Sequence, residues 1–358
     1  MSDSTDQTAE LHSDTHAELP AQPPTEQQAQ PHTETGAEAD NRWQQASERV
    51  NLLRSRINQV VIGQPSVVEQ VLIALLAGGH VLLEGVPGLG KTLLVRCLAS
   101  GFGGDFRRIQ FTPDLMPADV TGHAIYHMAE SRFEVRRGPV FTNLLLADEI
   151  NRAPAKTQAA LLEVMQEQQV TIDGETHATP RPFMVLATQN PVEQEGTYPL
   201  PEAELDRFML KILIDFPSQQ AEEALTAAAS GGQIEQQLRD SVEPVFDAGE
   251  LQQLQALVPQ VQVDQQVLSY AVRLVRATRE SSQLRRAAGP RASIGLIQAA
   301  RAHALLQGRD FVLPDDIKAM AVPVMRHRVA VSPDMEIDGE TADSVLAQII
   351  ESVEAPRL

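Results

Sequence analysis

The chain has 358 residues, 42% of them apolar, and a formal net charge of −19 at pH 7. This length suits about two domains, and the negative charge argues against nonspecific nucleic-acid binding, which depends on clustered Lys and Arg. A single cysteine, Cys97, excludes a disulfide within the chain. No apolar stretch approaches the ~20 residues of a membrane-spanning helix, and no secretory signal is evident at the N-terminus, so we expect a cytoplasmic protein.

Residues 1–42 have a composition of their own. Acidic residues far outnumber the single base, Arg42, and the larger aliphatic residues are limited to Leu11 and Leu19. Such a segment cannot bury enough apolar area to offset the entropy lost on ordering. We therefore predict a disordered acidic tail over residues 1–42.

Helical periodicity begins directly after this tail. Apolar residues at spacings of three and four predict a helix over 50–61 and a second one over 66–77, with Ile-Gly-Gln-Pro at 62–65 between them. Residues 80–84 then form a short apolar run that is typical of a buried strand.

The most specific motif follows this strand. The segment Gly85-Val86-Pro87-Gly88-Leu89-Gly90-Lys91-Thr92 fits G-x-x-x-x-G-K-[ST], the phosphate-binding loop of nucleoside triphosphatases. Backbone N–H groups of such a loop surround the phosphates at a helix N-terminus. Lys91 can reach the β- and γ-phosphates, and the Thr92 hydroxyl can ligate Mg²⁺. The loop and the adjoining Leu93 are therefore predicted to bind a nucleoside triphosphate.

Four further apolar runs predict additional strands. Continuous apolar strands that alternate with helices indicate a parallel sheet covered on both faces, and its chemistry is expected beyond the carboxyl ends of the strands. The runs cover residues 107–111, 143–147, 183–187 and 208–214.

Two acids at the end of one of these strands complete the expected phosphate site. Asp148 and Glu149 directly follow the run at 143–147. Asp148 is predicted to hold the Mg²⁺ shell, and Glu149 to polarise the water that attacks the γ-phosphate. A strand that ends in acids only to face solvent is the less favoured interpretation.

Asn190 and Arg207 are weaker candidates for the same site. Asn190 closes the strand at 183–187 and can orient the attacking water, although an Asn-Pro pair is also an ordinary turn. Arg207 precedes the last strand and can neutralise charge on a γ-phosphate as an arginine finger. An ion pair of Arg207 with Asp206 or Glu204 is the alternative.

Residues 218–358 are predicted to form a second, helical domain. The alanine-rich or amphipathic stretches in it carry no strand pattern of weight, Pro314 marks a helix start, and Ser293 is a candidate helix cap. The stretches are 221–229, 251–257, 267–278, 294–306 and 315–325.

These features together resemble the AAA+ superfamily of ATPases, and within it the MoxR group, over residues 43–355. The order and spacing of the matching pieces are far more specific than any one piece. The pieces are Val61-Ile62-Gly63-Gln64, the loop at 85–92, Leu145 to Arg152, Ala187-Thr188-Gln189-Asn190-Pro191, Glu202 to Phe208, and Gly289-Pro290-Arg291-Ala292-Ser293.

Two finer features point to the MoxR group. The run from Arg108 to Pro117, followed by Thr121-Gly122, is similar to that group's second-strand signature. Residues 133–141 alternate around a turn as a hairpin would, and they resemble the insertion in helix 2 that MoxR proteins share with magnesium-chelatase subunits.

The resemblance implies a fold and a set of roles. It implies an α/β core with a five-stranded parallel sheet over residues 43–217, with the helix-2 insertion at about 115–141, and a small all-α lid over 218–358. Ile62 and Gly63 would lie against the adenine. Asn190 would sense the γ-phosphate, Arg207 would be a finger reaching a neighbouring subunit, with Arg152 as the other candidate, and Arg291 would be a second sensor from the lid.

The resemblance also implies function and partners. ATP and Mg²⁺ would be the cofactors of an ATPase that forms a homo-oligomer, expected as a hexameric ring. The ATPase would remodel or mature a protein client, with a von Willebrand factor A-domain protein as a further partner. A nucleic-acid-associated motor and a nucleotide-gated scaffold remain as alternatives. The acidic balance weighs against the motor, and intact Lys91, Asp148 and Glu149 weigh against the scaffold.

Overall fold

A computed structural model describes residues 36–86, 88–190, 196–232 and 244–357. The tail predicted over 1–42 therefore lies mostly outside the described residues. Its expected boundary is late, because the first helix, α1 (Gly36–Val60), already begins at Gly36. The second predicted helix is α2 (Pro65–Leu76), which starts with proline at its first position.

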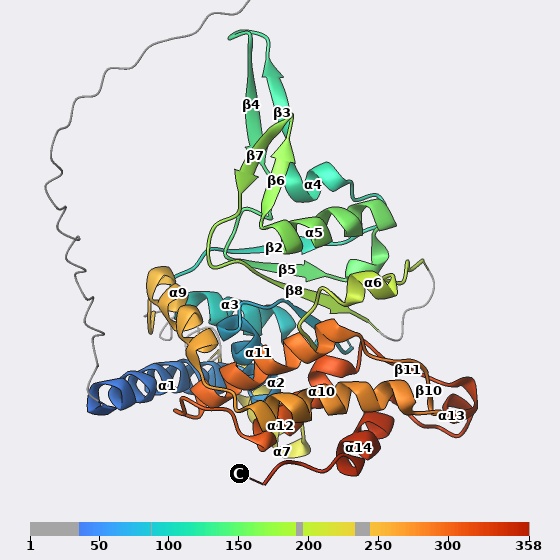
Figure 1. The fold of residues 1–358 in the computed structure, drawn as a ribbon. Helices are drawn as coiled ribbons and strands as arrows, with labels where there is room; N and C mark the ends of the chain where they lie inside the picture. The colour runs from blue at the N-terminus through green and yellow to red at the C-terminus, as the bar shows by residue number, and fades with distance from the viewer. Residues whose placement is uncertain (1–35, 87, 191–195, 233–243, 358) are drawn as a thin grey trace, which may run out of the picture.

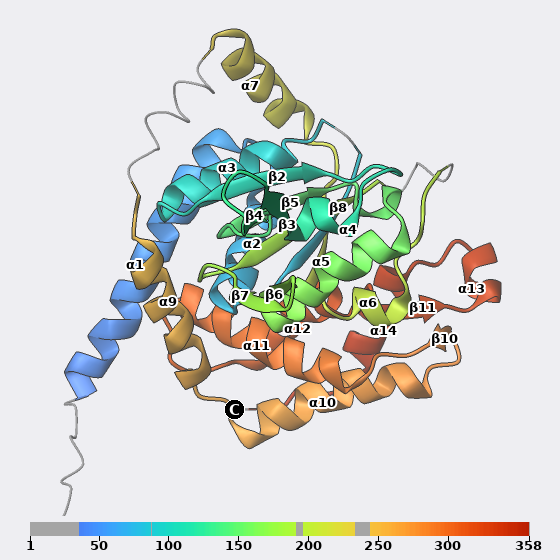
Figure 2. The same ribbon diagram turned by 90° about the horizontal axis from the view of Figure 1, so that it is seen from above.

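The centre of the molecule is a parallel sheet of five strands in the order β2-β5-β8-β1-β9. Three of them, β2, β5 and β8, are labelled in Figures 1 and 2. All four neighbouring pairs run parallel, so the predicted fold class is confirmed. The strands are β1 (Val81–Glu84), β2 (Phe106–Gln110), β5 (Leu144–Asp148), β8 (Met184–Gln189) and β9 (Leu210–Leu213).

Position in the sheet explains the sequence of each strand. The central β5 and β8 are buried along nearly their whole length, whereas the edge strand β2 exposes Arg107 and Arg108. On β5, Leu144 and Leu146 belong to one buried cluster, and Leu145 and Ala147 to another. This alternation shows that both faces of the sheet are covered, as continuous apolar strands require.

Different helices cover the two faces. The first cluster joins β-strand residues to α1, α2 and α3 (Lys91–Gly101), and the second joins them to α5 (Ala155–Glu167). Cys97 of α3 is buried, and burial raises the pKa of its thiol to about 11, so it is an inert part of the core. A 3₁₀ turn at Ile150–Arg152 and the short α6 (Glu202–Leu205) connect the remaining strands.

The predicted insertion forms a hairpin that projects from the sheet (Figure 1). The short α4 (Pro117–Thr121) leads into β3 (Gly122–His127), which pairs with β4 (Arg132–Arg137). The hairpin turn lies at 128–131, ahead of the position expected from the sequence, and the residues from Gly138 onward leave the pair. Gly138 lies so close to the backbone of Val120 that a side chain would not fit there.

A second hairpin, absent from the sequence predictions, stands beside the first one. It consists of β6 (Gln169–Ile172) and β7 (Glu175–Ala178). Asp173 and Gly174 connect them, and both have positive φ, of 51° and 83°. This is the Asp-Gly turn that best matches the twist of paired strands.

The region after β9 is mainly helical, as predicted, but it also contains a two-stranded antiparallel pair, β10 (Leu284–Arg286) and β11 (Ala330–Val331). The all-α expectation is wrong in this detail, because three- and two-residue strands leave no periodic pattern. The helices are α7 (Gln219–Ser230), α9 (Ala248–Leu257), a 3₁₀ turn (Val258–Gln260), α10 (Gln265–Glu280), α11 (Pro290–Leu306), α12 (Pro314–Met325), α13 (Pro333–Ile337) and α14 (Ala342–Ser352).

Prolines set the starts of two lid helices. α12 begins at Pro314 as expected. α11 begins at Pro290 after Gly289, so Ser293 lies inside the first turn and is not the cap. The fixed φ of proline suits the first helical position, which has no N–H partner to lose.

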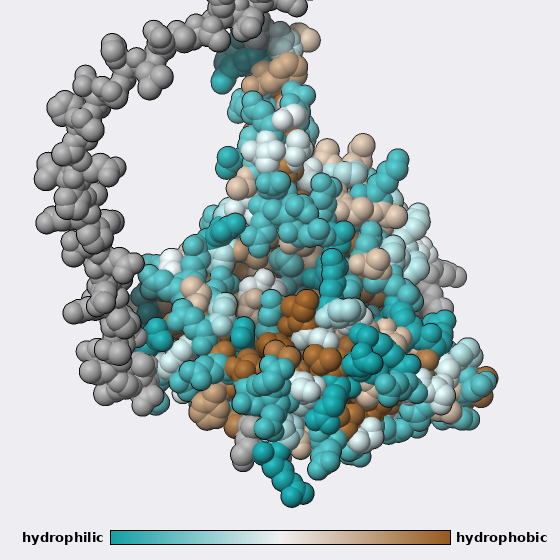
Figure 3. Space-filling model, in the orientation of Figure 1, coloured by the Kyte–Doolittle hydropathy of each residue, from teal (hydrophilic) through white to brown (hydrophobic). Residues whose placement is uncertain are grey.

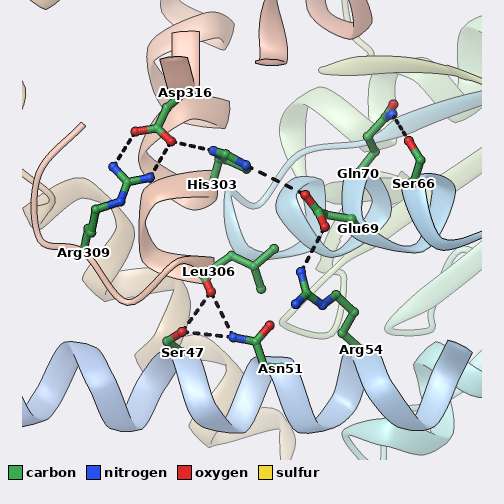
Figure 4. Close-up of polar contacts among 10 residues, drawn as sticks. All are labelled: Ser47, Asn51, Arg54, Ser66, Glu69, Gln70, His303, Leu306, Arg309 and Asp316. Carbon is green, nitrogen blue, oxygen red and sulfur yellow. Dashed lines mark hydrogen bonds and ion pairs between the residues drawn. The ribbon is translucent and has the colours of Figure 1, made fainter. Parts of the chain in front are cut away.

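The lid and the N-terminal helices share one hydrophobic core. A single buried cluster joins α1 and α2 to α10, α11 and α12. Polar contacts bridge the same helices (Figure 4): Asp316 accepts hydrogen bonds from Arg309 and His303, and His303 faces Glu69 of α2 at 3.8 Å. Glu69 also pairs with Arg54 of α1 at 2.9 Å. The lid is therefore anchored on α1 and α2.

Candidate functional site

The phosphate-binding loop connects β1 to α3, and glycine makes its path possible. Gly88 and Gly90 have φ of +88° and +79°, values that favour glycine, and a Cβ at either position would meet no atom within 4 Å. Backbone conformation, not crowding, therefore requires glycine there. Lys91 begins α3, and its Nζ donates to the Gly85 carbonyl.

This loop opens into a hollow of about 380 Å³, named here the phosphate cavity. Strands β2, β5 and β8 bring their carboxyl ends to it, as parallel-sheet topology predicts. Asn190 follows β8 and is buried. The lining residues are Gly88, Gly90, Lys91, Thr92, Leu93, Arg108, Gln110, Asp148, Glu149, Thr188 and Asn190.

Asp148 is held by two donors from neighbouring strands. Its Oδ1 accepts from the Thr188 hydroxyl at 2.6 Å, and its Oδ2 accepts from the Arg108 guanidinium at 2.6 Å. These contacts fix the carboxylate at the mouth of the cavity. A carboxylate has about four lone-pair sites, so Asp148 keeps acceptor capacity for a cation.

Glu149 stands in an unusual backbone conformation. Its φ of 57° and ψ of 49° are left-handed, which is uncommon for a residue with a side chain and costs about 1–3 kcal/mol. The Thr188 hydroxyl accepts its backbone N–H at 2.9 Å, and Gln110 donates to its carboxylate at 2.7 Å. Arg152 approaches the same carboxylate at 3.2 Å. Strain maintained by several neighbours is typical of a functional position.

Lys91 carries its charge in a partly desolvated place. Burial lowers the pKa of its ammonium, and the charges of Asp148, Glu149 and Glu84 oppose that effect. The three carboxylates thus partly compensate the buried cation.

The residues present fit a magnesium ion. Mg²⁺ prefers oxygen ligands and is commonly held by one or two carboxylates together with substrate phosphates and water. Thr92 and Asp148 line the same cavity beside Lys91. They supply one hydroxyl and one carboxylate, the donor set expected from the sequence.

A second hollow of about 330 Å³, the base cavity, adjoins the phosphate cavity and shares Gly88, Gly90 and Leu93 with it. It is largely apolar, which suits a nucleobase. Its other lining residues are Val60, Val61, Ile62, Gln64, Leu89, Phe216, Pro217, Glu222 and Leu225.

Ile62, expected against the adenine, lines this cavity, and Leu89 of the phosphate-binding loop lines it in place of the phosphate cavity, whereas Gly63 does not line it. A Cβ on Gly63 would stand 2.8 Å from that of Ala221 and 3.0 Å from that of Pro217, so this glycine allows the chain after β9 to pack closely. Gly85 and Val86 are absent from both linings, and Pro87 lies outside the described residues.

Arg207 and Arg291 are brought together, but in a third hollow of about 390 Å³, named here the arginine cavity. None of the described residues of the phosphate-binding loop lines it. The lining residues are Gly78, Gly79, His80, Met165, Gln166, Gln168, Asp206, Arg207, Met209, Arg291, Ile294, Gly295, Gln298 and Arg328.

The local contacts of Arg207 differ from the ion pair considered above. Its guanidinium donates to the Leu162 carbonyl at 2.7 Å, and Asp206 pairs with Arg328 instead. Glu204 is close enough for Arg207 to act on it electrostatically, but burial has the larger effect and raises the pKa of Glu204. No ion pair of Arg207 occurs among the described residues.

The phosphate cavity and the arginine cavity lie at opposite ends of the strands. Lys91 follows the carboxyl end of β1, whereas Gly79 and His80 precede its amino end. A four-residue strand spans ~13 Å, which is longer than an arginine side chain. The structure therefore does not place Arg207 or Arg291 on the phosphates of their own chain.

Sequence reasoning assigned no role to three residues of the phosphate cavity, namely Arg108, Gln110 and Thr188. Arg108 and Gln110 are two apart on β2 and share one face of the strand. That spacing was a usable signal. Thr188 gave none, because its role depends on the pairing of β5 with β8.

The fold and the phosphate cavity define a P-loop ATPase with a helical lid, and comparisons agree. Residues 80–210 match the ATPase family associated with various cellular activities (AAA), and residues 276–349 match the AAA lid domain. A crystal structure of an ATPase candidate from Cytophaga hutchinsonii superposes with a TM-score of 0.82 at 40% identity, covering 90% of this chain and 99% of that one.

Named relatives specify the family. Chaperone MoxR1 of Mycobacterium tuberculosis is 44% identical over 311 residues, which covers 84% of this chain and 81% of the relative. YeaC of Bacillus subtilis is 46% identical, with coverage of 84% and 92%, and protein MoxR of Methylorubrum extorquens is 31% identical, with coverage of 88% and 96%. The chain belongs to the MoxR family of AAA+ ATPases.

Within the described residues, no helix is both long and apolar enough to cross a membrane.

Proposed function

We propose that this protein hydrolyses ATP with Mg²⁺ as a homo-oligomer, expected as a hexameric ring, whose reaction sites are shared between neighbouring subunits. The observation that carries the proposal is the separation of two sets of groups. The phosphate cavity contains Lys91, Thr92, Asp148, Glu149 and Asn190. The two candidate arginines, Arg207 and Arg291, lie in the arginine cavity at the opposite end of the strands. A neighbouring subunit can bring the two sets together.

Within one chain, each group has a defined task. Lys91 would bind the β- and γ-phosphates, Thr92 and Asp148 would hold Mg²⁺, which supplies charge neutralisation when bound, and Glu149 would accept a proton from the attacking water. Asn190 would orient that water.

Arg207 and Arg291 would then act on the nucleotide of the adjacent subunit. Arg207 lies in the arginine cavity without an ion pair among the described residues, and Arg291 is exposed at the first turn of α11. The surface nearby is suited to association: Ile294 of α11 is 59% exposed and lines the same cavity. Apolar surface gathers at the level of α10 and α11, while the projecting hairpins are mainly polar (Figure 3).

A mixing experiment tests the shared site. Arg207→Ala keeps an intact phosphate cavity, and Lys91→Ala keeps an intact arginine cavity. Each variant alone should hydrolyse ATP far more slowly than wild type, but a mixed ring has interfaces that combine the two intact halves, so hydrolysis should return. If subunits exchange and the mixture stays inactive, the shared site is wrong, and Arg152, which lies beside Glu149, becomes the leading arginine.

For the task of the ATPase, we propose remodelling or maturation of a protein client, with a von Willebrand factor A-domain protein as an expected partner. Support comes from the relative named chaperone MoxR1. Glu149→Gln should hold ATP without hydrolysis and so retain the client in a pull-down. The alternative, a nucleic-acid motor, predicts that DNA stimulates hydrolysis, which the net charge of −19 disfavours.

A further inference from the structure

One lid residue contacts the backbone on both sides of Arg207. Arg328 follows α12, and its side chain is only 5% exposed. Its Nε donates to the Asp206 carboxylate at 2.6 Å, and its terminal nitrogens donate to the carbonyls of Phe208 at 2.7 Å and Met209 at 3.1 Å. The planar fork of an arginine thus holds the segment that carries the finger.

The same guanidinium also reaches α12, the lid helix that packs against α11. It donates to the Val324 carbonyl of α12. Val324 and the Arg328 guanidinium both lie beside Gly295 of α11, one turn beyond Arg291. Arg291 is near enough for its charge to act on Arg328, although burial is the main cause that lowers the pKa of Arg328. One buried cation therefore connects the segment of Arg207 with α12, and Val324 of α12 in turn packs beside Gly295 of α11, the helix that carries Arg291.

Stability alone does not explain this arrangement. Burying a charge carries a large desolvation penalty, and an apolar replacement of similar volume is often neutral or stabilising. Arg328 instead satisfies its donors with oxygens from residues 206, 208, 209 and 324, so that it imposes one geometry on two elements. His327, the residue before Arg328, also contacts the Phe208 carbonyl, through Nε2 at 3.0 Å.

We propose that Arg328 is a positioning residue, which sets the spacing between Arg207 and Arg291 so that both arginines meet a neighbouring subunit's nucleotide as one unit. This inference rests on the proposed shared site. Arg328 itself is buried and does not touch the nucleotide. Its loss should therefore act on hydrolysis through Arg207, while the phosphate cavity of the same chain stays intact.

The test uses Arg328→Lys in the full chain, because lysine keeps the charge but cannot reproduce the fork. Binding of a fluorescent ATP analogue should stay within about threefold of wild type, because the phosphate cavity is remote, and kcat should fall by at least about tenfold. The decisive readout is mixing: activity should return with Lys91→Ala, which supplies an intact arginine cavity, and should not return with Arg207→Ala.

Asp316→Asn is the matched control. Asp316 is a buried charged residue of α12, the helix that Arg328 follows. Its carboxylate contacts Arg309 and His303 (Figure 4) and accepts the N–H of Leu313. It makes no bond to residues 206–209. Asp316→Asn should therefore destabilise the lid without changing any contact of residues 206–209. It should not show the mixing pattern of Arg328→Lys.

Three results would overturn the inference: activity of Arg328→Lys within twofold of wild type, equal loss in Asp316→Asn, or no recovery with Lys91→Ala when Arg207→Ala does recover. If Arg207→Ala itself fails to recover, the shared site falls instead, so the two failures are distinguishable. Should Arg328→Lys not fold, Asp206→Ala removes the carboxylate that accepts the Nε–H and leaves the bonds to the Phe208 and Met209 carbonyls in place. It should show the same mixing pattern with a smaller loss, and wild-type behaviour of Asp206→Ala would equally overturn the inference.

Discussion

The phosphate cavity and the arginine cavity are similar in size, about 380 and 390 Å³, but they are built in opposite ways. In the first, the polar side chains bond to one another, as Thr188 does to Asp148 and Gln110 to Glu149. In the second, arginines bond largely to backbone carbonyls, as Arg207 does to Leu162. The first cavity is organised around its own acids, whereas in the second Arg207 forms no ion pair among the described residues. In the proposed shared site, each cavity would supply what the other lacks.

Substitutions in the phosphate cavity should have the greatest effect on ATP binding and hydrolysis. Lys91→Ala should weaken ATP binding by more than about a hundredfold, because Lys91 would make charged hydrogen bonds worth about 1.5–3 kcal/mol each. Glu149→Gln should bind normally and stop hydrolysis, since Glu149 acts chiefly on the attacking water. Titration with a fluorescent ATP analogue distinguishes the two. Equal loss of binding in both variants would contradict this division of roles.

Breaking the arginine cavity should leave binding nearly intact. Loss of an arginine finger typically costs ~10³–10⁵ in rate, so Arg207→Ala should bind ATP but hydrolyse it far more slowly. Wild-type specific activity should rise with protein concentration, because only assembled interfaces are complete. A coupled phosphate-release assay measures both. Specific activity that is independent of concentration down to the monomer would count against a shared site.

A smaller loss of activity is expected when the hydroxyl that contacts both acids of the phosphate cavity is removed. Thr188→Val removes the hydroxyl that donates to Asp148 and accepts the N–H of Glu149. We expect kcat to fall about ten- to hundredfold, as lost hydrogen bonds of about 1.4–2.8 kcal/mol imply. The dissociation constant for ATP should change little. Thr188→Ser keeps the hydroxyl and should stay near wild type, and a matching loss in this control would assign the effect to packing.

The last prediction concerns stability in acid, not activity, and a histidine of the arginine cavity. His80 is buried there, its Nδ1 accepts the N–H of Val185 at 3.0 Å, and burial lowers its pKa to about 4. Because this pKa lies below the unfolded value of about 6.5, the unfolded chain binds more protons between the two values. The free energy of unfolding should therefore fall by about 3 kcal/mol as pH drops from 6.5 to 4.

Urea unfolding at several pH values measures this loss. His80→Gln is the control, because the glutamine amide can still donate a hydrogen bond to the Met165 carbonyl, which His80 contacts through Nε2. The variant should show a flatter pH dependence. An unchanged slope in His80→Gln would mean that other groups, such as the buried His327, dominate.

Local pattern was enough for the elements that carry the chemistry. The five strands and the phosphate-binding loop were predictable because continuous apolar runs and glycine spacing are properties of short segments. It was also predictable that Arg207 comes shortly before the last strand of the sheet, β9. Its distance from the loop of its own chain was not, because that depends on which end of β1 each segment joins.

Other features were hidden for specific reasons. The Asp173-Gly174 turn carried a usable hairpin signal that the interpretation passed over. β10 and β11 could not be predicted, because each has only two or three residues and leaves no periodicity, and residues 287–329 separate them in the chain. The bonds of Arg328 to residues 206–209 depend on lid docking, which no local pattern describes.

The shared interior of α1, α2 and the lid helices bears on how the chain folds. Val50 and Leu53 of α1 lie in the same buried cluster as Leu296 and Ala300 of α11, although they are more than 240 residues apart. The cluster can close only after nearly the whole chain has left the ribosome. Severing the chain at 217 would expose an apolar face on each fragment. The boundary between core and lid thus separates two structural units that should acquire their native state in a single cooperative step.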